Sequence, residues 1–219
     1  NDQLFLYPYL GLFIKDFVVN SSQQKEIEQI ENFEEKRHIG ENDSKICTLI
    51  RQDSIVEFIT YVNEINLPLN SKISHSIYET HSFLSEKNPT LIEYATFFGS
   101  IQIFKYLINK KVELNSSLWL YAVHSDNAEI FEILEEKVIS NDETFCEVLK
   151  ESIKCHHNNF ANYIIDNLLS EQTSEFKKEL ANIIVKSKNF YYFPDDINRL
   201  ISTYKNIIVN LHYQCFVLH

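Results

Sequence analysis

The chain has 219 residues, of which 44% are hydrophobic and 23% charged, a composition typical of a folded protein rather than a disordered one. Its formal net charge of −11 argues against nucleic acid or an anionic membrane as the main partner, because both carry negative charge. The three glycines are far apart, so the chain lacks the glycine cluster that P-loop and Rossmann nucleotide sites need.

The cysteines and the apolar opening point to a reduced, cytoplasmic protein. The four cysteines show no paired spacing, and no secretory signal precedes them, so we expect them to be reduced and mostly buried. The apolar stretch 4–19 is interrupted by proline, glycine and charged residues and is too short to span a bilayer. Because the chain begins with Asn1 and contains no methionine, we expect it to be part of a longer protein.

The first segment, residues 1–43, combines this apolar opening with an acidic amphipathic helix. Its apolar residues recur at helical spacing, with Ser22 as the expected N-cap and Gly40 as the expected C-cap. The glutamates of its other face are expected to be solvated.

The second segment, residues 44–189, contains about four similar pairs of short helices, the first of them degenerate. Each later pair begins with an apolar helix around Ala95, Ala122 or Ser152 and continues with a second helix about eight residues on. In the first pair, Cys47 is aligned with Ala95, and the interval between these two residues is far longer than the later ones. The excess, residues 68–88, is interpreted either as an extra helix or as an ordered loop.

The last part of the chain extends the helical pattern. An amphipathic helix is predicted over 176–187, followed by a C-terminal segment, 190–219, with one more helix and an apolar tail that suggests truncation of a longer array. Helix pairs of this kind cannot bury an apolar face alone and are expected to stack on their neighbours.

The middle pairs resemble the ankyrin repeat and, more closely, the degenerate ankyrin-repeat families found in large sets of protist proteins. The resemblance is carried by the residues at the places of the ankyrin pattern: Thr90, Ile92, Ala95, Gly99, Ile103, Leu107 and Asn115. It implies an all-α fold, an ankyrin-like helical solenoid of stacked helix pairs. Since the repeats are shorter than the about 33 residues of an ankyrin unit, the β-fingers are expected to be shortened or absent.

The resemblance also implies a function, since ankyrin-like repeats commonly bind a protein partner. With reduced fingers, we expect the exposed face of each first helix to carry the binding residues. The candidates are Tyr94, Phe97, Phe98, Tyr121 and His124. Aromatic residues exposed in a row would form a binding hot spot, whereas the alternative is that they simply pack in the core.

The sequence offers weak candidates for a metal site and for a catalytic nucleophile. Cys146, Cys155, His156 and His157 lie close together, but their spacing matches no zinc template, so no metal or other cofactor is expected. Neither Cys47 nor Cys155 has the context of a catalytic nucleophile, so no enzyme activity and no small-molecule substrate are expected. The function predicted is a non-enzymatic protein–protein interaction module; the alternative is a structural cap or spacer of a longer repeat array.

Overall fold

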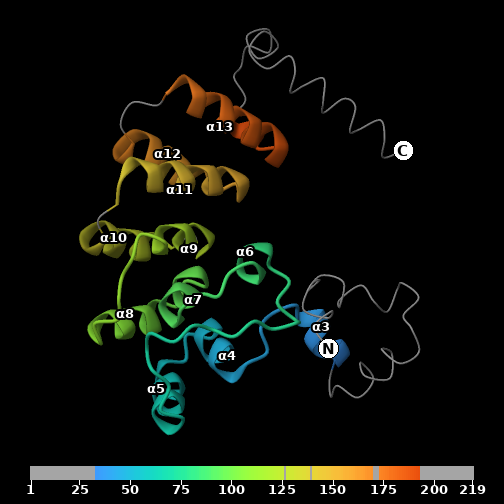
Figure 1. Ribbon diagram of the computed structural model, residues 1–219, viewed down its shortest axis with the longest axis vertical. Helices are drawn as coiled ribbons and strands as arrows, with labels where there is room; N and C mark the ends of the chain where they lie inside the picture. Colours follow the sequence, from blue (N-terminus) through green and yellow to red (C-terminus); the bar gives the residue numbers. More distant parts are fainter. Residues whose placement is uncertain (1–32, 126, 139, 170–172, 193–219) are drawn as a thin grey trace. The chain divides into compact units, whose positions relative to one another are not determined.

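The computed structural model describes residues 33–125, 127–138, 140–169 and 173–192 (Figure 1). Within these ranges the chain forms helices and no strand, with one isolated antiparallel bridge between Lys72 and Thr90. The expected all-α class is therefore confirmed. The chain divides into two compact units, Asn1–Glu113 and Leu114–His219, and the boundary lies inside the segment predicted to contain the repeats.

The first unit contains one short leading helix and two helix pairs, separated by an irregular segment with a single helical turn. Its helices are α3 (Phe33–Ile39), α4 (Lys45–Arg51), α5 (Ile55–Glu64), α6 (Ser82–Ser85), α7 (Leu91–Phe97) and α8 (Ile101–Asn109). The two pairs pack on each other, with α4 against α7 and α5 against α8.

Helix α3 is the described end of the predicted acidic helix, whose beginning near Ser22 lies outside the described residues. It stops at Gly40, as expected, because Gly40 has a left-handed backbone (φ 70°) and donates its N–H to the carbonyl of Lys36 at 3.1 Å. Any larger residue here would also clash with Thr80, since a Cβ at this position would lie 2.8 Å from its Oγ1.

The turns inside three helix pairs share one geometry. Each contains a left-handed residue, and these are Asp53, Gly99 and His156, with φ of 49°, 68° and 62°. The backbone N–H of the next residue then donates to a carbonyl five positions earlier, which closes the turn as in a Schellman motif. The donor and acceptor residues are Ser54 and Leu49, Ser100 and Ala95, and His157 and Ser152, at 3.1, 2.9 and 2.9 Å.

These turns correct the alignment of the first pair. Leu49, not Cys47, occupies the place of Ala95, so the predicted equivalence was displaced by two residues. The turn that marks the register carries Asp53 instead of a glycine, so no glycine in the sequence indicates it. The small residues of the later pairs are placed as expected, since Ala95, Ala122 and Ser152 are all fully buried.

The segment 68–88 is an ordered excursion with one helical turn, α6, rather than a full extra helix. Its two ends are joined by backbone hydrogen bonds, from Ile73 N–H to the Pro89 carbonyl at 2.7 Å and from Leu91 N–H to the Ser71 carbonyl at 3.2 Å. It also folds back on the end of α3, where Thr80 donates both its N–H and its hydroxyl to the Gly40 carbonyl.

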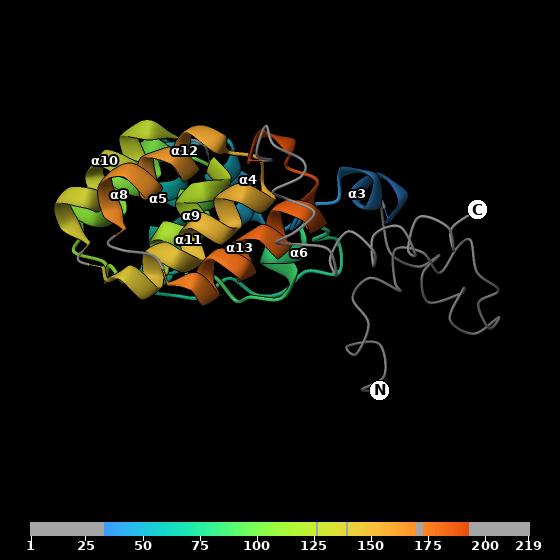
Figure 2. The same cartoon turned by 90° about the horizontal axis from the view of Figure 1, so that it is seen from above.

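The second unit contains two helix pairs and a longer final helix. Its elements are α9 (Leu118–Ser125), α10 (Ala128–Lys137), α11 (Asp142–Lys154), α12 (Asn158–Tyr163), the π-helical turn η2 (Ile164–Leu168), α13 (Ser174–Ser187) and the 3-10 turn η3 (Phe190–Tyr192). Helix α11 contacts both α9 and α13, so the three helices lie side by side in this unit (Figures 1 and 2). Helix α13 confirms the helix predicted over 176–187, while the helix predicted after Pro194 lies outside the described residues.

The core of the second unit is built on aromatic side chains. Trp119 in α9 contacts Phe131 and Phe145 edge to face, with ring centroids 5.4 and 5.3 Å apart, and Phe131 stacks on Phe160 at 3.9 Å. Edge-to-face pairs of this kind add to the stabilisation from apolar burial. These contacts hold α9, α10, α11 and α12 together and so determine where the last turn of α9 lies relative to α11.

Candidate functional site

The aromatic residues predicted to bind a partner are mostly not exposed. Tyr94, Phe97 and Tyr121 retain 1%, 7% and 4% of their surface, so the exposure expected for them was wrong. In α7 the burial is caused by the excursion, residues 68–88. Its His81 and Phe83 rings lie 4.8 and 6.0 Å from the ring of Phe97. The helix face that a repeat would leave open is therefore covered by a segment whose conformation was not predicted.

Tyr94 is held inside the first unit by a polar contact. Its hydroxyl accepts a hydrogen bond from Nη1 of Arg51 at 2.9 Å, and Arg51 also pairs through Nε with Glu41 at 2.7 Å. Burial of the ring raises the pKa of Tyr94 well above its usual range. Tyr94 thus behaves as an internal residue that orders Arg51 and Glu41.

Phe98 is the predicted aromatic residue that remains half-exposed, and it lies in a hollow of the first unit. The hollow has about 820 Å³ of empty space, part of it open to solvent. Its lining consists of Ile39, Gly40, Glu41, Glu79, Thr80, His81, Ser82, Phe97 and Phe98. Apolar and aromatic groups form one part of this wall, and Ile39 is 57% exposed beside them.

The acidic members of this wall differ in their surroundings. The Glu79 carboxylate accepts hydrogen bonds from the backbone N–H of His81 at 3.0 Å and of Asn42 at 3.4 Å, and burial raises the pKa of Glu79. The Glu41 side chain is 41% exposed and faces both Arg51 and solvent. Glu41 therefore supplies the accessible negative charge of the hollow.

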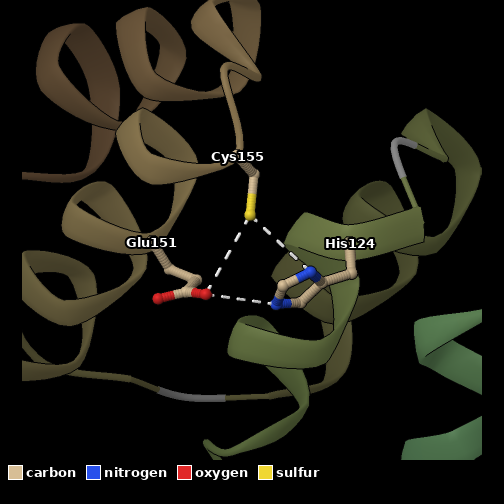
Figure 3. A group of neighbouring side chains, drawn as sticks. All are labelled: His124, Glu151 and Cys155. Atoms are coloured by element: carbon tan, nitrogen blue, oxygen red, sulfur yellow. Dashed lines mark hydrogen bonds and ion pairs between the residues drawn. The ribbon is translucent and has the colours of Figure 1, made fainter. Parts of the chain in front are cut away.

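The second unit brings together a different set of polar side chains. His124 is in the last turn of α9, Glu151 is in the last turn of α11, and Cys155 is the C-cap of α11 (Figure 3). Glu151 and Cys155 are four residues apart, so they project from the same side of the helix toward the imidazole. His124 was predicted to bind a partner, but its side chain is only 7% exposed and faces these two residues.

The three side chains are within a few ångströms of one another. Nδ1 of His124 lies 3.6 Å from Sγ of Cys155, and Nε2 lies 3.4 Å from Oε1 of Glu151. The Cys155 sulfur is 3.9 Å from the same Oε1, and the other carboxylate oxygen accepts from Nζ of Lys154 at 3.1 Å. If one ligand atom is taken from each residue, the sulfur, an imidazole nitrogen and a carboxylate oxygen all lie within 4.8 Å of one another.

The electrostatics of this cluster argue against an activated nucleophile. The His124 imidazole, 3.4 Å from Oε1, together with Lys154 lowers the pKa of Glu151 to about 2 although burial opposes this. Burial and the Glu151 charge raise the pKa of Cys155 to about 11, so its sulfur is a neutral thiol near pH 7. A Cys–His–acid arrangement favours catalysis only when the thiolate is stabilised, whereas here it is disfavoured.

The cluster differs from the cysteine–histidine group weighed in the sequence. Only Cys155 belongs to both, since His156 interacts through Nε2 with the Ser187 carbonyl at 3.0 Å and His157 precedes α12 as its N-cap residue. The spacing of Glu151 and Cys155 is visible in the sequence. The third member, His124, comes from another helix pair, and no sequence spacing identifies it.

Comparisons of the chain with family models, curated proteins and solved structures found no match. Among the described residues, no helix combines the length and the apolar character that crossing a bilayer requires. The ankyrin-like interpretation therefore remains a prediction, and the functional proposals below depend on the geometry of the two units.

Proposed function

We propose that this chain is a non-enzymatic protein–protein interaction module made of ankyrin-like helix pairs, and that a partner segment binds in the hollow of the first unit. The observation that carries the proposal is the hollow itself, where half-exposed Phe98 and exposed Ile39 stand beside the accessible carboxylate of Glu41. The wall of the hollow is mixed, and its apolar part, formed by Ile39, Phe97 and Phe98, is where the anchor side chain of a partner would pack.

The partner expected at this site is a short segment with an apolar or aromatic anchor next to lysine or arginine. The anchor would contact the rings of Phe97 and Phe98, and a basic neighbour would approach Glu41. The formal charge of −11 on the chain favours the approach of basic segments by long-range attraction, which affects the association rate more than the final affinity.

The ankyrin-like part of the proposal is supported by hydrogen bonds between consecutive pairs of the first unit. Ser100, at the start of α8, donates its hydroxyl to the Ile50 carbonyl of α4 at 2.6 Å. The Asp53 carboxylate accepts from the backbone N–H groups of Gln102 and Ile103, both at 3.0 Å. Each helix pair thus relies on its neighbour for hydrogen-bond partners as well as for burial of its apolar face.

The structural alternative also has an observation in its favour. Because Tyr94, Phe97 and Tyr121 are buried, replacing them would destabilise the fold rather than remove a contact surface. A cap or spacer of a longer array would need this internal packing but no anchor site. The two functions are separated only by residues that are exposed and not required for folding.

Ile39 and Val56 provide such a matched test, since both are exposed apolar residues of the first unit, at 57% and 69%. Ile39 borders the hollow and Val56, on α5, does not. A display library of short segments, each with one apolar residue flanked by basic residues, is selected against the full chain. We expect Ile39→Glu to weaken the binding of the selected segments at least tenfold. Val56→Glu should leave their binding unchanged. Equal effects of the two changes, or no selected segment, would contradict the binding proposal and favour the structural alternative.

A further inference from the structure

We propose that His124, Glu151 and Cys155 form a binding site for a zinc ion, with the imidazole, one carboxylate oxygen and the thiolate as protein ligands and a water molecule as the fourth. The three residues come from two helices that pack directly on each other in the second unit, α9 and α11. Sulfur, imidazole nitrogen and carboxylate oxygen are the three donor types that zinc takes in proteins. This site is independent of the partner surface proposed above.

With one imidazole nitrogen chosen, the three ligand atoms lie within 4.8 Å of one another, so they must move closer together to hold a four-coordinate ion. Tetrahedral bonds of about 2.3 Å to sulfur and about 2.0–2.1 Å to nitrogen and oxygen place the ligand atoms roughly 3.4–3.6 Å apart. The cluster has Nδ1 to Sγ at 3.6 Å, Nε2 to Oε1 at 3.4 Å and Sγ to Oε1 at 3.9 Å. Since the two short contacts use different nitrogens of one ring, His124 must rotate to bring a single nitrogen toward both partners.

The surroundings hold the ligands in place. Glu151 and Cys155 are fixed at the end of α11, where the Cys155 N–H donates to the Glu151 carbonyl at 2.9 Å. Nζ of Lys154 binds the Oε2 atom of Glu151, which leaves Oε1 facing the ring and the sulfur. Such an outer contact orients a carboxylate ligand and tunes its basicity. The His124 side chain, at 7% exposed, and the Glu151 side chain, at 17%, are shielded enough from water to favour a defined geometry.

Binding requires the loss of one proton from sulfur. The Cys155 thiol and the zinc ion give a zinc–thiolate bond, and the proton goes to solvent. Because the thiol must release this proton to bind, the apparent affinity for zinc is expected to increase with pH. The ion brings two positive charges to one carboxylate and one thiolate, so the loaded site is neutral beside Lys154.

Cobalt(II) is the probe of choice, because it takes the same tetrahedral sites and its thiolate complexes absorb light. We expect one equivalent of Co²⁺ to give the full chain a thiolate-to-cobalt charge-transfer band. Adding zinc should then displace the cobalt ion and remove the band. Cys155→Ser abolishes the band, and His124→Asn weakens binding at least tenfold. Cys146→Ser is the matched control, since Cys146 lies on the same helix α11 and is not part of the cluster. Circular dichroism checks that each variant is folded, and Cys155→Ala replaces the serine variant if that one is not.

A second measurement uses the unmodified chain. Zinc is expected to slow alkylation of Cys155 at least tenfold and to leave alkylation of Cys146 unchanged, as followed by mass spectrometry. The absence of a charge-transfer band, a band that persists in the Cys155 variant, or equal alkylation with and without zinc would each overturn the proposal.

Discussion

Replacing Asp53 tests whether consecutive helix pairs stabilise each other through polar contacts. Its carboxylate lies in the turn between α4 and α5, yet it accepts hydrogen bonds from Gln102 and Ile103, the second and third residues of α8, both at 3.0 Å. The N-cap residue of α8, Ser100, directs its own hydroxyl to the Ile50 carbonyl instead. The cap of α8 is therefore supplied by the preceding helix pair.

The expected loss in the free energy of unfolding follows from these contacts. An N-cap is worth about 0.5–2 kcal/mol, and a negative charge at a helix start adds about 0.3–1 kcal/mol. We therefore expect Asp53→Ala to lower the free energy of unfolding of the first unit by about 2 kcal/mol. Asp53→Asn keeps one accepting oxygen and tolerates the backbone φ of 49°, so it should lose only about 1 kcal/mol.

Hydrogen exchange at the Gln102 and Ile103 amides is the most direct assay. A loss of about 2 kcal/mol corresponds to roughly thirtyfold faster exchange there, with a parallel shift of the urea midpoint. Asn66→Ala is the matched control, because Asn66 has the same left-handed backbone (φ 53°) at the end of α5. Unchanged exchange in Asp53→Ala, or equal losses in Asp53→Ala and Asn66→Ala, would refute the reasoning that the carboxylate caps α8.

Three further outcomes follow from the same structure. Tyr121→Ser should destabilise the second unit by about 3 kcal/mol because the ring is 4% exposed, and fluorescence of Trp119 during urea unfolding would measure it; a loss under 1 kcal/mol would contradict its place in the core. Thr90→Ala removes the hydroxyl that accepts from the Glu93 N–H and should cost about 1 kcal/mol, seen as faster exchange of that amide; unchanged exchange would show that the capping box is not formed. Because the pKa of Glu151 falls from 4.5 to about 2 on folding, its contribution is present above pH 4.5 and disappears as the pH drops toward 2; the stability difference between wild type and Glu151→Gln should shrink over this range, and a constant difference would refute it.

Most helices, and the turns that contain a glycine, could be predicted because they leave a local record in the sequence. Apolar residues at helical spacing give α7, α8, α10 and α11, and the small residues Ala95, Ala122 and Ser152 are fully buried as expected. Gly40 and Gly99 adopt the left-handed conformation that was expected of helix ends and turns. Each of these features is decided within a few residues of the chain.

The candidate site could not be predicted in the same way. Helical periodicity shows that Tyr94 and Phe97 lie on particular faces of α7, but not whether another segment covers those faces. The covering residues His81 and Phe83 belong to an irregular excursion that has no period to detect. The approach of His124 to Cys155 likewise depends on the packing of two helices from different pairs, which is a property of the assembled unit.

The excursion, residues 68–88, also affects how the helix pairs of this chain are aligned with one another. Since the bridge between Lys72 and Thr90 closes it at its base, the polypeptide leaves the helix pairs and returns at nearly the same point. Changes of length inside this detour are limited by its contacts, because His81 and Phe83 cover Phe97 and Thr80 binds Gly40. The long interval before Ala95 is occupied by this detour, and a pattern that demands constant spacing misaligns the first helix pair.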